Sequence, residues 1–501
     1  MERHQEREQT FDVDDAFCLG ELLSPLARGG ATVGEAEVEH LRATYYDTED
    51  LALLHAGITL RRRVGGHDAG WHLKLPADAP GERTELRLPL ESSSDAVPPE
   101  LVDLLTAPLR GRGLRPVLAL QTDRTARVVR RGDSGGVELA DDRVVAERLI
   151  DGGVEAWREI EVEWLGADGE LASSAARLLE RAGARPAAIG SKAARALGVT
   201  PGTPGSGTGG TRQPGQVLPA QLEALFGEVI RQDLAFRQGR LEAVHDLRVA
   251  IRRLRSLLRT FKPLLEKRAL EPVVRELAWL GGVLGTARER EVLAAHTERA
   301  LDALAPEERL GPVRAALAGP LAGAAAAARD EVRAALGTPR YAQLLVALAE
   351  IAARPPVRER VRARALRRCV RRELRGAIAT WQSALRTRGP GRDGAIHEAR
   401  KAAKRVRYAA ETIAPLAPKA AARFAAGFRS LQEVLGERHD AVVARAHYAR
   451  EGARAGVRPG ENGFTYGILA ERERAAIAEL DAALPRLWRR AGRRRLRRFL
   501  D

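Results

Sequence analysis

A basic amphipathic helix occurs twice in the second half of the chain, and this repeat constrains the fold more than any other feature. Residues 245–261 and 397–408 both begin with the motif His-x-x-Arg-x-x-x-(Arg/Lys)-Arg-x-Arg. A Leu-Gly-x-x-x-(Asp/Glu) motif follows each copy, and its glycine, Gly285 or Gly436, lies 40 or 39 residues after the histidine. Paired motifs at nearly constant spacing indicate a duplicated unit. The sequence therefore predicts two similar helical bundles.

Helical geometry places the cations of each copy in a row. At about 100° per residue, most basic residues of the first copy fall within a stripe about 80° wide, and its large apolar residues fill another face that can pack in a core. Two rows that face each other would suit a long polyanion. The simpler interpretation is a solvated basic face, but the duplication favours binding. The predicted polyanion-binding residues are His245, Arg248, Arg252, Arg253, Arg255, Arg259, His397, Arg400, Lys401, Lys404, Arg405 and Arg407.

Charge is distributed unevenly along the chain. Residues 1–210 carry 25 Lys and Arg against 35 Asp and Glu, whereas residues 211–501 carry 57 against 32. A strongly basic half suggests nucleic acid, an anionic membrane surface or polyphosphate as a partner. Aromatic residues make up only 4% of the chain. Proteins that bind single-stranded nucleic acid usually stack bases on aromatic side chains, so nucleic acid is the less favoured partner.

Cysteine usage and hydropathy bear on the compartment. Cys18 and Cys369 lie in different halves without metal-ligand spacing, which fits a reducing cytoplasm. The N-terminus does not read as a signal peptide. No run approaches 18 apolar residues, so we expect no transmembrane helix and a cytoplasmic protein.

The first 165 residues read mainly as strands whose polar faces carry charge. Because strand side chains alternate, two glutamates share a face in 6–8, two arginines in 61–63 and three glutamates in 159–163. Stacked glutamates repel one another unless a cation lies among them. A closed barrel with these faces inward would hold a hard divalent ion on its carboxylates and phosphate oxygens on its cations. The alternative is an ordinary antiparallel sheet with one wet face.

A segment rich in glycine, proline and threonine divides the chain. Residues 201–216 have the composition of a flexible linker and separate domains at 1–200 and 217–501. The second domain reads as eight to ten helices, with breaks that include Gly281-Gly282 and Gly319-Pro320. The predicted fold class is α+β, with an antiparallel β-barrel and flanking helices followed by an all-α domain of two repeated bundles.

Seven motifs in order make residues 1–200 resemble the CYTH family, the triphosphate tunnel metalloenzymes. They are Glu6-x-Glu8-x-Thr10, Thr44-Tyr45-Tyr46-Asp47-Thr48, 57–63, 70–76, 83–87, 157–163 and Ser191-Lys192. The resemblance implies hydrolysis of inorganic triphosphate or short polyphosphate with Mg²⁺ or Mn²⁺. The metal ligands it implies are Glu6, Glu8, Glu85, Asp142, Glu159, Glu161 and Glu163. The triphosphate-binding residues it implies are Arg61, Arg63, Lys74, Arg87, Arg124, Arg143 and Lys192.

Two positions depart from the family pattern. Thr10 stands where the family signature has lysine, and Thr122 stands where a basic residue often precedes Arg124 by two positions. A tunnel that lacks two cations would bind triphosphate and cleave it slowly. The alternative function is therefore a non-catalytic, granule-associated protein that binds polyphosphate. A nucleotidyl cyclase is a further analogy within the family, but the sequence shows no purine-specific feature.

The repeated motifs make residues 217–501 resemble the CHAD family, an all-helical domain named for its paired histidines. The resemblance implies that a basic channel between the two halves binds inorganic polyphosphate, and that the protein associates with polyphosphate granules. The histidines could instead be metal ligands. Neither has a His, Cys or carboxylate three or four residues along the helix, which favours phosphate contact. The basic run 489–498 either extends this surface or is a solvated helix end.

Overall fold

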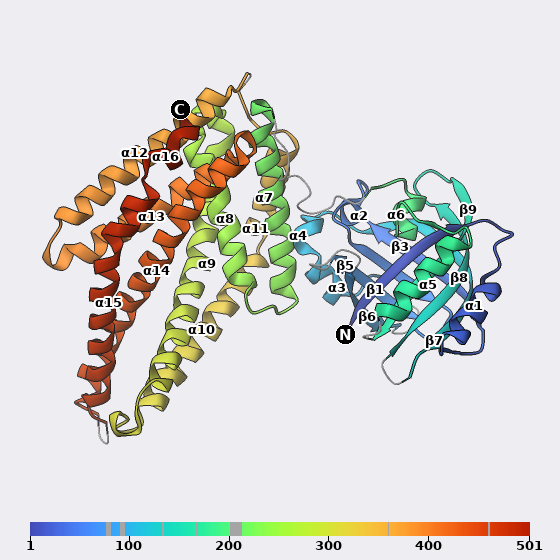
Figure 1. Ribbon diagram of the computed structural model, residues 1–501, viewed down its shortest axis with the longest axis horizontal. Coiled ribbons are helices and arrows are strands. Elements are labelled where there is room, and N and C mark those ends of the chain that lie inside the picture. Colours follow the sequence, from blue (N-terminus) through green and yellow to red (C-terminus); the bar gives the residue numbers. More distant parts are fainter. Residues whose placement is uncertain are drawn as a thin grey trace. The chain divides into compact units, whose positions relative to one another are not determined.

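The computed structural model describes residues 1–76, 82–90, 96–132, 135–166, 169–200, 213–358, 360–458 and 461–501. They form two compact units, Met1–Pro204 and Gly205–Asp501. The first unit is built mainly of strands and the second of helices, which confirms the predicted α+β fold class (Figure 1). Most of the predicted linker, residues 201–212, lies outside the described residues. Helix α7 (Pro214–Arg237) already includes the linker's last three residues.

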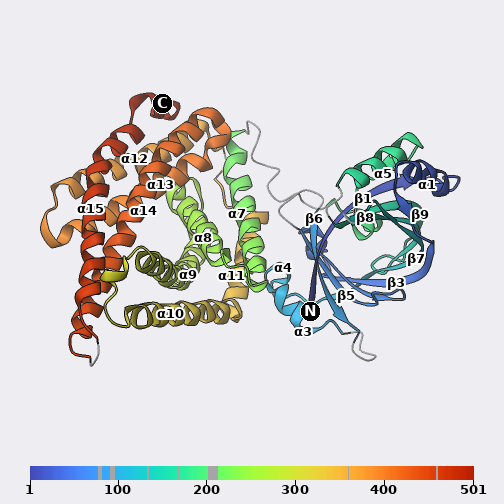
Figure 2. The same cartoon turned by 60° about the horizontal axis from the view of Figure 1, so that its bottom comes forward.

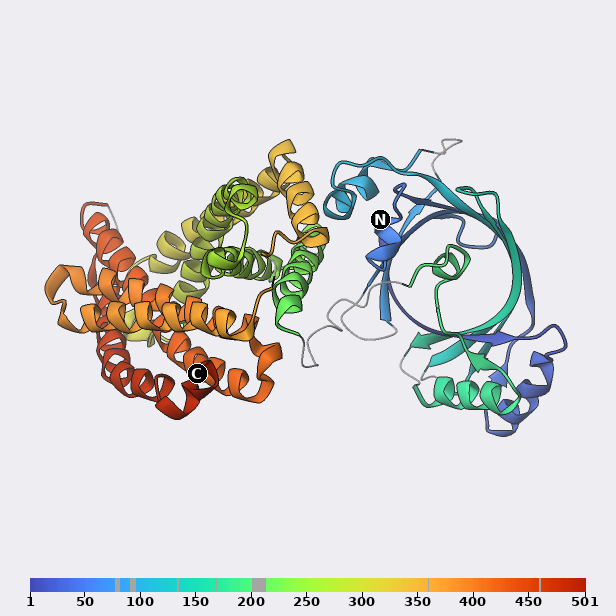
Figure 3. The same ribbon diagram turned by 90° about the horizontal axis from the view of Figure 1, so that it is seen from above.

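Eight antiparallel strands close the barrel in the order β1-β6-β5-β4-β3-β7-β8-β9, and β9 pairs back with β1 (Figure 3). The strands of the barrel are β1 (Glu2–Val13), β3 (Glu37–Asp47), β4 (Thr59–Val64), β5 (Gly70–Pro76), β6 (Glu82–Pro89), β7 (Arg115–Arg130), β8 (Gly135–Arg148) and β9 (Val154–Gly166). Short strands β2 (Thr32–Val33) and β10 (Arg185–Pro186) pair with β7 and β1. The helices of this unit are α1 (Leu19–Arg28), α2 (Ala52–His55), α3 (Pro99–Leu104), α4 (Thr106–Leu109), α5 (Gly169–Arg181) and α6 (Lys192–Ala196).

Helices α1 and α5 cover part of the outside of the barrel. They pack on an apolar cluster that includes Phe11 of β1 and Ile160 and Val162 of β9. Because strand side chains alternate, burial of these residues beneath the helices turns the charged residues between them toward the interior. On the interior side, Ala193 and Ala194 of α6 pack against residues of β3, β7 and β8. The barrel therefore has a polar interior that a short helix closes in one region.

Asp47 connects the end of β3 to α2. Its buried carboxylate accepts hydrogen bonds from the backbone N–H groups of Thr48 at 2.6 Å, Leu53 at 2.9 Å and Leu54 at 2.9 Å. The aspartate of the Tyr-Tyr-Asp-Thr motif thus caps a helix.

We expect Asp47→Ala to lower the free energy of unfolding by about 3 kcal/mol, because it leaves buried N–H groups without acceptors. Urea denaturation of Asp47→Ala beside Glu49→Ala, an exposed neighbour, measures the effect. Equal stability of the two variants would contradict this role.

The second unit repeats one pattern of helices. Its remaining described helices are α8 (Ala243–Thr260), α9 (Lys267–Asp302), α10 (Val313–Leu336), α11 (Pro339–Ala353), α12 (Ala363–Arg386), α13 (Arg392–Thr412), α14 (Pro418–Ala455), α15 (Phe464–Ala491) and α16 (Arg494–Arg497). In each half, the helix with the histidine motif is followed by a short 3-10 helix, η1 (Lys262–Leu264) or η4 (Ala414–Leu416), and then by a long helix. Helix α8 contacts α13, and α9 contacts α14, so the halves meet along their matching helices (Figure 2).

Two predicted helix breaks are wrong. Gly281-Gly282 lies inside α9, and Gly319-Pro320 lies inside α10. A Cβ atom on Gly281 would lie 3.8 Å from Ile251 Cγ2, in ordinary van der Waals contact, so this part of α9 packs directly on α8. Proline at position 320 removes one backbone donor and crowds the preceding turn, but packing against α9 keeps α10 continuous. In the described part of the chain, no helix combines the length and the apolar character needed to span a bilayer.

Candidate functional site

The inward faces of the strands line a cavity of about 360 Å³. Strand register brings the charged residues together. Glu163 of β9 lies opposite Glu8 of β1 and Glu138 of β8, while His72 of β5 lies opposite Arg61 of β4 and Arg87 of β6. The sequence-predicted residues that line this cavity are Glu6, Glu8, Asp142, Glu161, Glu163, Arg61, Arg63, Lys74, Arg87, Arg124 and Lys192.

Two predicted carboxylates lie behind the lining. Glu85 is fully buried, 2.9 Å from His72 Nδ1, and it also pairs with Arg87. Glu159 accepts a hydrogen bond from Trp157 Nε1 at 2.5 Å and lies 2.7 Å from Lys192 Nζ. Both carboxylates thus belong to the charge network of the cavity.

Arg143 is a correction to the predicted triphosphate-binding set. Its neighbours Asp142 and Val144 face the interior, so strand alternation directs Arg143 outward, where it is exposed. The structure therefore does not bring Arg143 into the cavity.

Lys74 bridges the two glutamates of the N-terminal signature. Its Nζ lies 2.6 Å from Glu6 Oε2 and 3.6 Å from Glu8 Oε2. Burial raises the pKa of Glu6, while Lys74 opposes that rise. Burial also raises the pKa of Glu163 to about 7, assisted by repulsion from Glu6. This part of the cavity carries more negative charge than its cations neutralise, which favours a further cation.

A second carboxylate group forms where β8 and β9 meet α6. Oxygen atoms of Asp142, Glu159 and Glu161 all lie within 4.8 Å of one another. Oxygen donors at this spacing fit a hard divalent ion such as Mg²⁺ or Mn²⁺, and the ammonium of Lys192 already stands among them as a cation. Burial opposes ionisation of Glu161, but Lys192 and Arg124 outweigh it and hold the pKa of Glu161 well below its usual range. We call Asp142, Glu159 and Glu161 the acidic triad.

Arg124 connects the acidic triad to the cations of the cavity. Its Nε and Nη2 donate to the two carboxylate oxygens of Asp142 at 2.8 and 2.7 Å, and Nη2 also donates to Glu161 at 2.6 Å. Burial lowers the pKa of Arg63 to about 9, together with repulsion from nearby arginines that include Arg61 and Arg124. Crowded cations of this kind gain stability when an anion binds between them.

The two threonines that depart from the family pattern also line or border the cavity. Thr122 lies in its lining, and Thr10 donates a hydrogen bond to the carbonyl oxygen of Gly190 at 3.4 Å. Both side chains are buried and uncharged. Thr10 pairs with Glu161 in the sheet, so a lysine at position 10 would have joined the acidic triad region.

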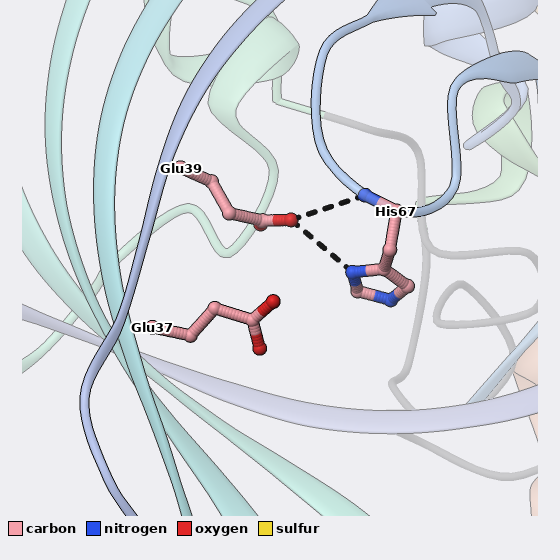
Figure 4. Close-up of side chains that lie close together, drawn as sticks. All are labelled: Glu37, Glu39 and His67. Atoms are coloured by element: carbon pink, nitrogen blue, oxygen red, sulfur yellow. Dashed lines mark hydrogen bonds and ion pairs between the residues drawn. The ribbon is translucent and has the colours of Figure 1, made fainter.

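The sequence interpretation missed further residues of the cavity. Its lining also includes His4, Gln5, Glu39, His67, Asp68, Arg83 and Glu138. Glu39 accepts hydrogen bonds from the backbone N–H and Nδ1 of His67 at 3.2 and 3.1 Å, and Glu37 lies beside them (Figure 4). These contacts attach the β4–β5 turn to β3. Strand alternation could have indicated Glu138 and Arg83, but the turn residues carry no such signal.

In the second unit, five cations of the two predicted rows come together with two histidines. Arg252 Nε of α8 donates to the hydroxyl of Tyr408 on α13 at 2.9 Å, and the guanidinium carbon of Arg407 lies 4.9 Å from the same ring. Burial lowers the pKa of Lys404 to about 6, and repulsion from Arg400 and Arg252 adds to the shift. We call this set the basic cluster; its members are His245, Arg248, Arg252, His397, Arg400, Lys404 and Arg407.

The Leu-Gly motifs place small residues beside the basic cluster. A Cβ atom on Gly285 of α9 would lie 3.8 Å from the Arg248 guanidinium, and one on Gly436 of α14 would lie 3.6 Å from Arg400 Nη2. A Cβ atom there would only touch the arginines, whereas side chains longer than alanine would crowd them. The two arginines occupy matching positions of the repeat. The motifs thus belong to the same site as the histidine helices.

Residues that follow those glycines were missed as site residues. The His439 ring lies 4.4 Å from the His397 ring, and burial lowers the pKa of His439 to about 4, with Arg400 adding to the shift. Arg288 takes the matching place in the first half, where it helps burial to lower the pKa of His245. The second motif of the repeat could have indicated both positions.

Five predicted polyanion-binding residues lie outside the basic cluster. Arg253, Lys401 and Arg405 form ion pairs with Glu411, Glu398 and Glu373. Exposed Arg255 and Arg259 line a separate pocket of about 630 Å³ near the start of α9. The basic stripe of α8 continues past the point where α8 faces the other half. Helical periodicity alone therefore included Arg255 and Arg259 in the predicted polyanion-binding row, although they line a different pocket.

Comparisons with known proteins agree with both units. A family model of the CYTH domain matches residues 23–196, and a model of the CHAD domain matches residues 220–449. Two uncharacterized proteins of Mycobacterium tuberculosis, from strains CDC 1551 / Oshkosh and ATCC 25618 / H37Rv, are each 36% identical over 519 aligned residues, which cover 97% of this chain and 96% of theirs.

Solved structures give more distant similarities. PptA from Streptomyces chartreusis is 22% identical with a TM-score of 0.46, over 56% of this chain and 100% of that chain. The CHAD domain from the plant Ricinus communis is 24% identical with a TM-score of 0.40, over 59% of this chain and 97% of that chain. CYTH domains bind triphosphate substrates and depend on a divalent metal ion. The chain belongs to the family of proteins that join a CYTH domain and a CHAD domain in one polypeptide.

Proposed function

We propose that the barrel hydrolyses inorganic triphosphate or short polyphosphate with Mg²⁺ or Mn²⁺, and that the helical unit binds inorganic polyphosphate and associates with its granules. The observation that carries the first part is the cavity itself, in which arginine and lysine side chains and carboxylates from most barrel strands face one another. Arginine holds phosphate oxygens in bidentate fashion, and carboxylates hold divalent ions.

The side chains divide the work of hydrolysis between them. Arg61, Arg63 and Arg87 hold phosphate oxygens and stabilise the charge that spreads over them as a water oxygen attacks the terminal phosphorus. The P–O bond to the next phosphate breaks, orthophosphate and the shortened phosphate chain are released, and the proton lost by the water passes to solvent. Glu6, Glu8 and the acidic triad would hold the metal ion. When bound, the ion supplies Lewis-acid neutralisation of the phosphate charge.

Phosphate release from inorganic tripolyphosphate tests this proposal. The full chain is assayed with Mg²⁺, with Mn²⁺ and with chelator, beside Arg143→Ala, whose side chain lies outside the cavity. We expect release that requires the metal and is unchanged in Arg143→Ala. Bound tripolyphosphate without release would contradict hydrolysis.

The second candidate function is a non-catalytic protein that binds polyphosphate. Buried Thr10 and Thr122 favour it, because two positions where the family has or often has a cation are neutral here. If the threonines limit turnover, Thr10→Lys should raise the release rate while tripolyphosphate binding changes little. The same assay therefore separates the two candidates.

The basic cluster supports the polyphosphate part of the proposal. Burial and the neighbouring cations of α8 and α13 lower the pKa values of Arg248, Arg400 and Lys404. Among the described residues, the carboxylates nearest to Arg248 and Arg407 lie 3.9 and 3.6 Å away. A polyanion that spans both rows would relieve this repulsion through charge-assisted hydrogen bonds. Long-chain polyphosphate should therefore displace duplex DNA from the protein more readily than DNA displaces polyphosphate.

Lys404 makes the expected affinity depend on pH. Its pKa of about 6 in the free protein, set by burial and the nearby arginines, leaves the amine mostly neutral at pH 7. Bound polyphosphate favours the ammonium form, so binding takes up a proton above pH 6. We expect the affinity to fall as pH rises above 6, by up to about tenfold per pH unit.

Calorimetry in buffers of different ionisation enthalpy measures this proton uptake. Long-chain polyphosphate is the ligand, because few of its groups are chain ends that titrate near neutrality. Lys404→Met should bind without the Lys404 share of the uptake, while Arg255→Met, in the separate pocket, should behave as the wild type. Unchanged uptake in Lys404→Met would refute the assignment.

A further inference from the structure

The ammonium of Lys192 lies in the place of a cation in the acidic triad. Its Nζ is 2.9 Å from Asp142 Oδ2, 2.7 Å from Glu159 Oε1 and 2.5 Å from Glu161 Oε1. An ammonium group has three N–H donors, and here each has its own carboxylate. The Lys192 side chain is mostly buried, at 11% exposed. The contact is therefore a complete coordination of the ammonium by oxygen.

The acidic triad is positioned independently of Lys192. Asp142 lies directly opposite Glu159 in the β8–β9 pair, and Glu161 is two residues further along the same face of β9. Trp157 Nε1 donates to Glu159, and Arg124 donates to both Asp142 and Glu161. These contacts hold the carboxylates on a rigid sheet, whereas Lys192 reaches them on a long flexible chain.

The charge of the acidic triad without Lys192 suits a divalent cation. Three carboxylates face Arg124 and Lys192 in direct contact, and Arg195, which also pairs with Asp12, lies 4.0 Å from Glu159. Without Lys192, the group loses its central positive charge, carries net negative charge and still has its oxygens within 4.8 Å of one another. A divalent ion would need the same oxygens at about 2.0–2.6 Å. The ammonium and the metal ion cannot occupy this point together.

We infer that Lys192 competes with the divalent ion for the acidic triad, and that a phosphate chain which attracts the lysine frees the triad for the metal. This inference deepens the proposed function and rests on it for the phosphate ligand. Metal and triphosphate then bind with positive coupling. Triphosphate draws Lys192 out of the triad and so opens the metal site, and the metal displaces Lys192 from the triad and so makes it available to the phosphate. The device would keep the free protein from binding metal tightly at the triad.

The test measures Mn²⁺ binding to the full chain without phosphate, using the electron paramagnetic resonance signal of free Mn²⁺. Lys192→Met removes the ammonium and keeps the length of the side chain. We expect one Mn²⁺ to bind at least about tenfold more tightly to Lys192→Met than to the wild type, because a buried positive charge is removed from beside the ion. Lys192→Arg, which keeps a positive charge near the carboxylates, should bind Mn²⁺ more weakly than Lys192→Met.

A double variant locates the gained site. Asp142→Asn in the Lys192→Met background should abolish the gain, and circular dichroism melts of all variants establish that they fold. Equal Mn²⁺ affinity of Lys192→Met and the wild type, or a gain that survives Asp142→Asn, would overturn the inference. The test measures Mn²⁺ binding and not phosphate release. A protein that fails to hydrolyse tripolyphosphate can therefore still confirm or overturn the competition between Lys192 and the metal ion.

Discussion

The double variant Glu6→Ala/Glu8→Ala is expected to lose metal-dependent phosphate release from tripolyphosphate by at least about 100-fold. Removal of two carboxylates takes away ligands that would hold the divalent ion and leaves Lys74 without its two partners. Loss of charge stabilisation worth about 3 kcal/mol already corresponds to that factor. Initial rates over a range of Mg²⁺ and Mn²⁺ concentrations measure the effect.

The controls for this variant separate metal binding from folding. Arg143→Ala changes a charge on the outer face of the same barrel and should keep the wild-type rate. Tripolyphosphate binding without metal should persist in the double variant, because Arg61, Arg63 and Arg124 remain in the cavity. Release at an unchanged rate would rule out Glu6 and Glu8 as metal ligands.

Arg248→Ala/Arg400→Ala is expected to weaken binding of long-chain polyphosphate by at least about 100-fold. The two arginines hold matching positions on α8 and α13, and each is partly buried beside a glycine of the following long helix. A charge-assisted hydrogen bond contributes about 1.5–3 kcal/mol, so loss of two such groups from facing rows exceeds 100-fold. Fluorescence anisotropy with labelled polyphosphate measures the affinity at fixed salt.

The same variant should not lose stability. Burial and neighbouring cations lower the pKa values of Arg248 and Arg400, so their removal relieves repulsion in the free protein. We expect an equal or higher melting temperature together with weaker binding. Arg255→Ala/Arg259→Ala is the matched control from the same helix, because these residues line the separate pocket. An equal loss of affinity in the control would show that polyphosphate binds elsewhere.

Much of the candidate site could be predicted because local periodicity decides which residues share a face. Alternation in β9 placed Glu159, Glu161 and Glu163 together, and the structure turns all three toward the interior. The same alternation places Arg143, which follows inward-facing Asp142, on the outer face of β8. Proximity in sequence to a site residue is therefore not sufficient in a strand, because adjacent side chains point to opposite faces.

The helical row shows where periodicity stops being sufficient. A stripe on one helix includes Arg255 and Arg259, but only contact with α13 determines how far the basic cluster extends. His439 and Arg288 join the cluster from α14 and α9, and their place depends on how those helices pack. Similarly, Gly281-Gly282 predicted a break, although packing against α8 keeps α9 continuous.

The sequence by itself determined the two-domain division, the barrel, the repeated helical halves and most of the charged residues of both sites. Each of these depends on alternation, helical periodicity or duplicated spacing, which are properties of short segments. Only the tertiary structure decided that the Lys192 ammonium lies within the acidic triad and that burial, together with the arginines of two basic rows, lowers the pKa of Lys404. Such contacts join residues far apart in the chain, and their energies depend on burial and distance, which no local pattern contains.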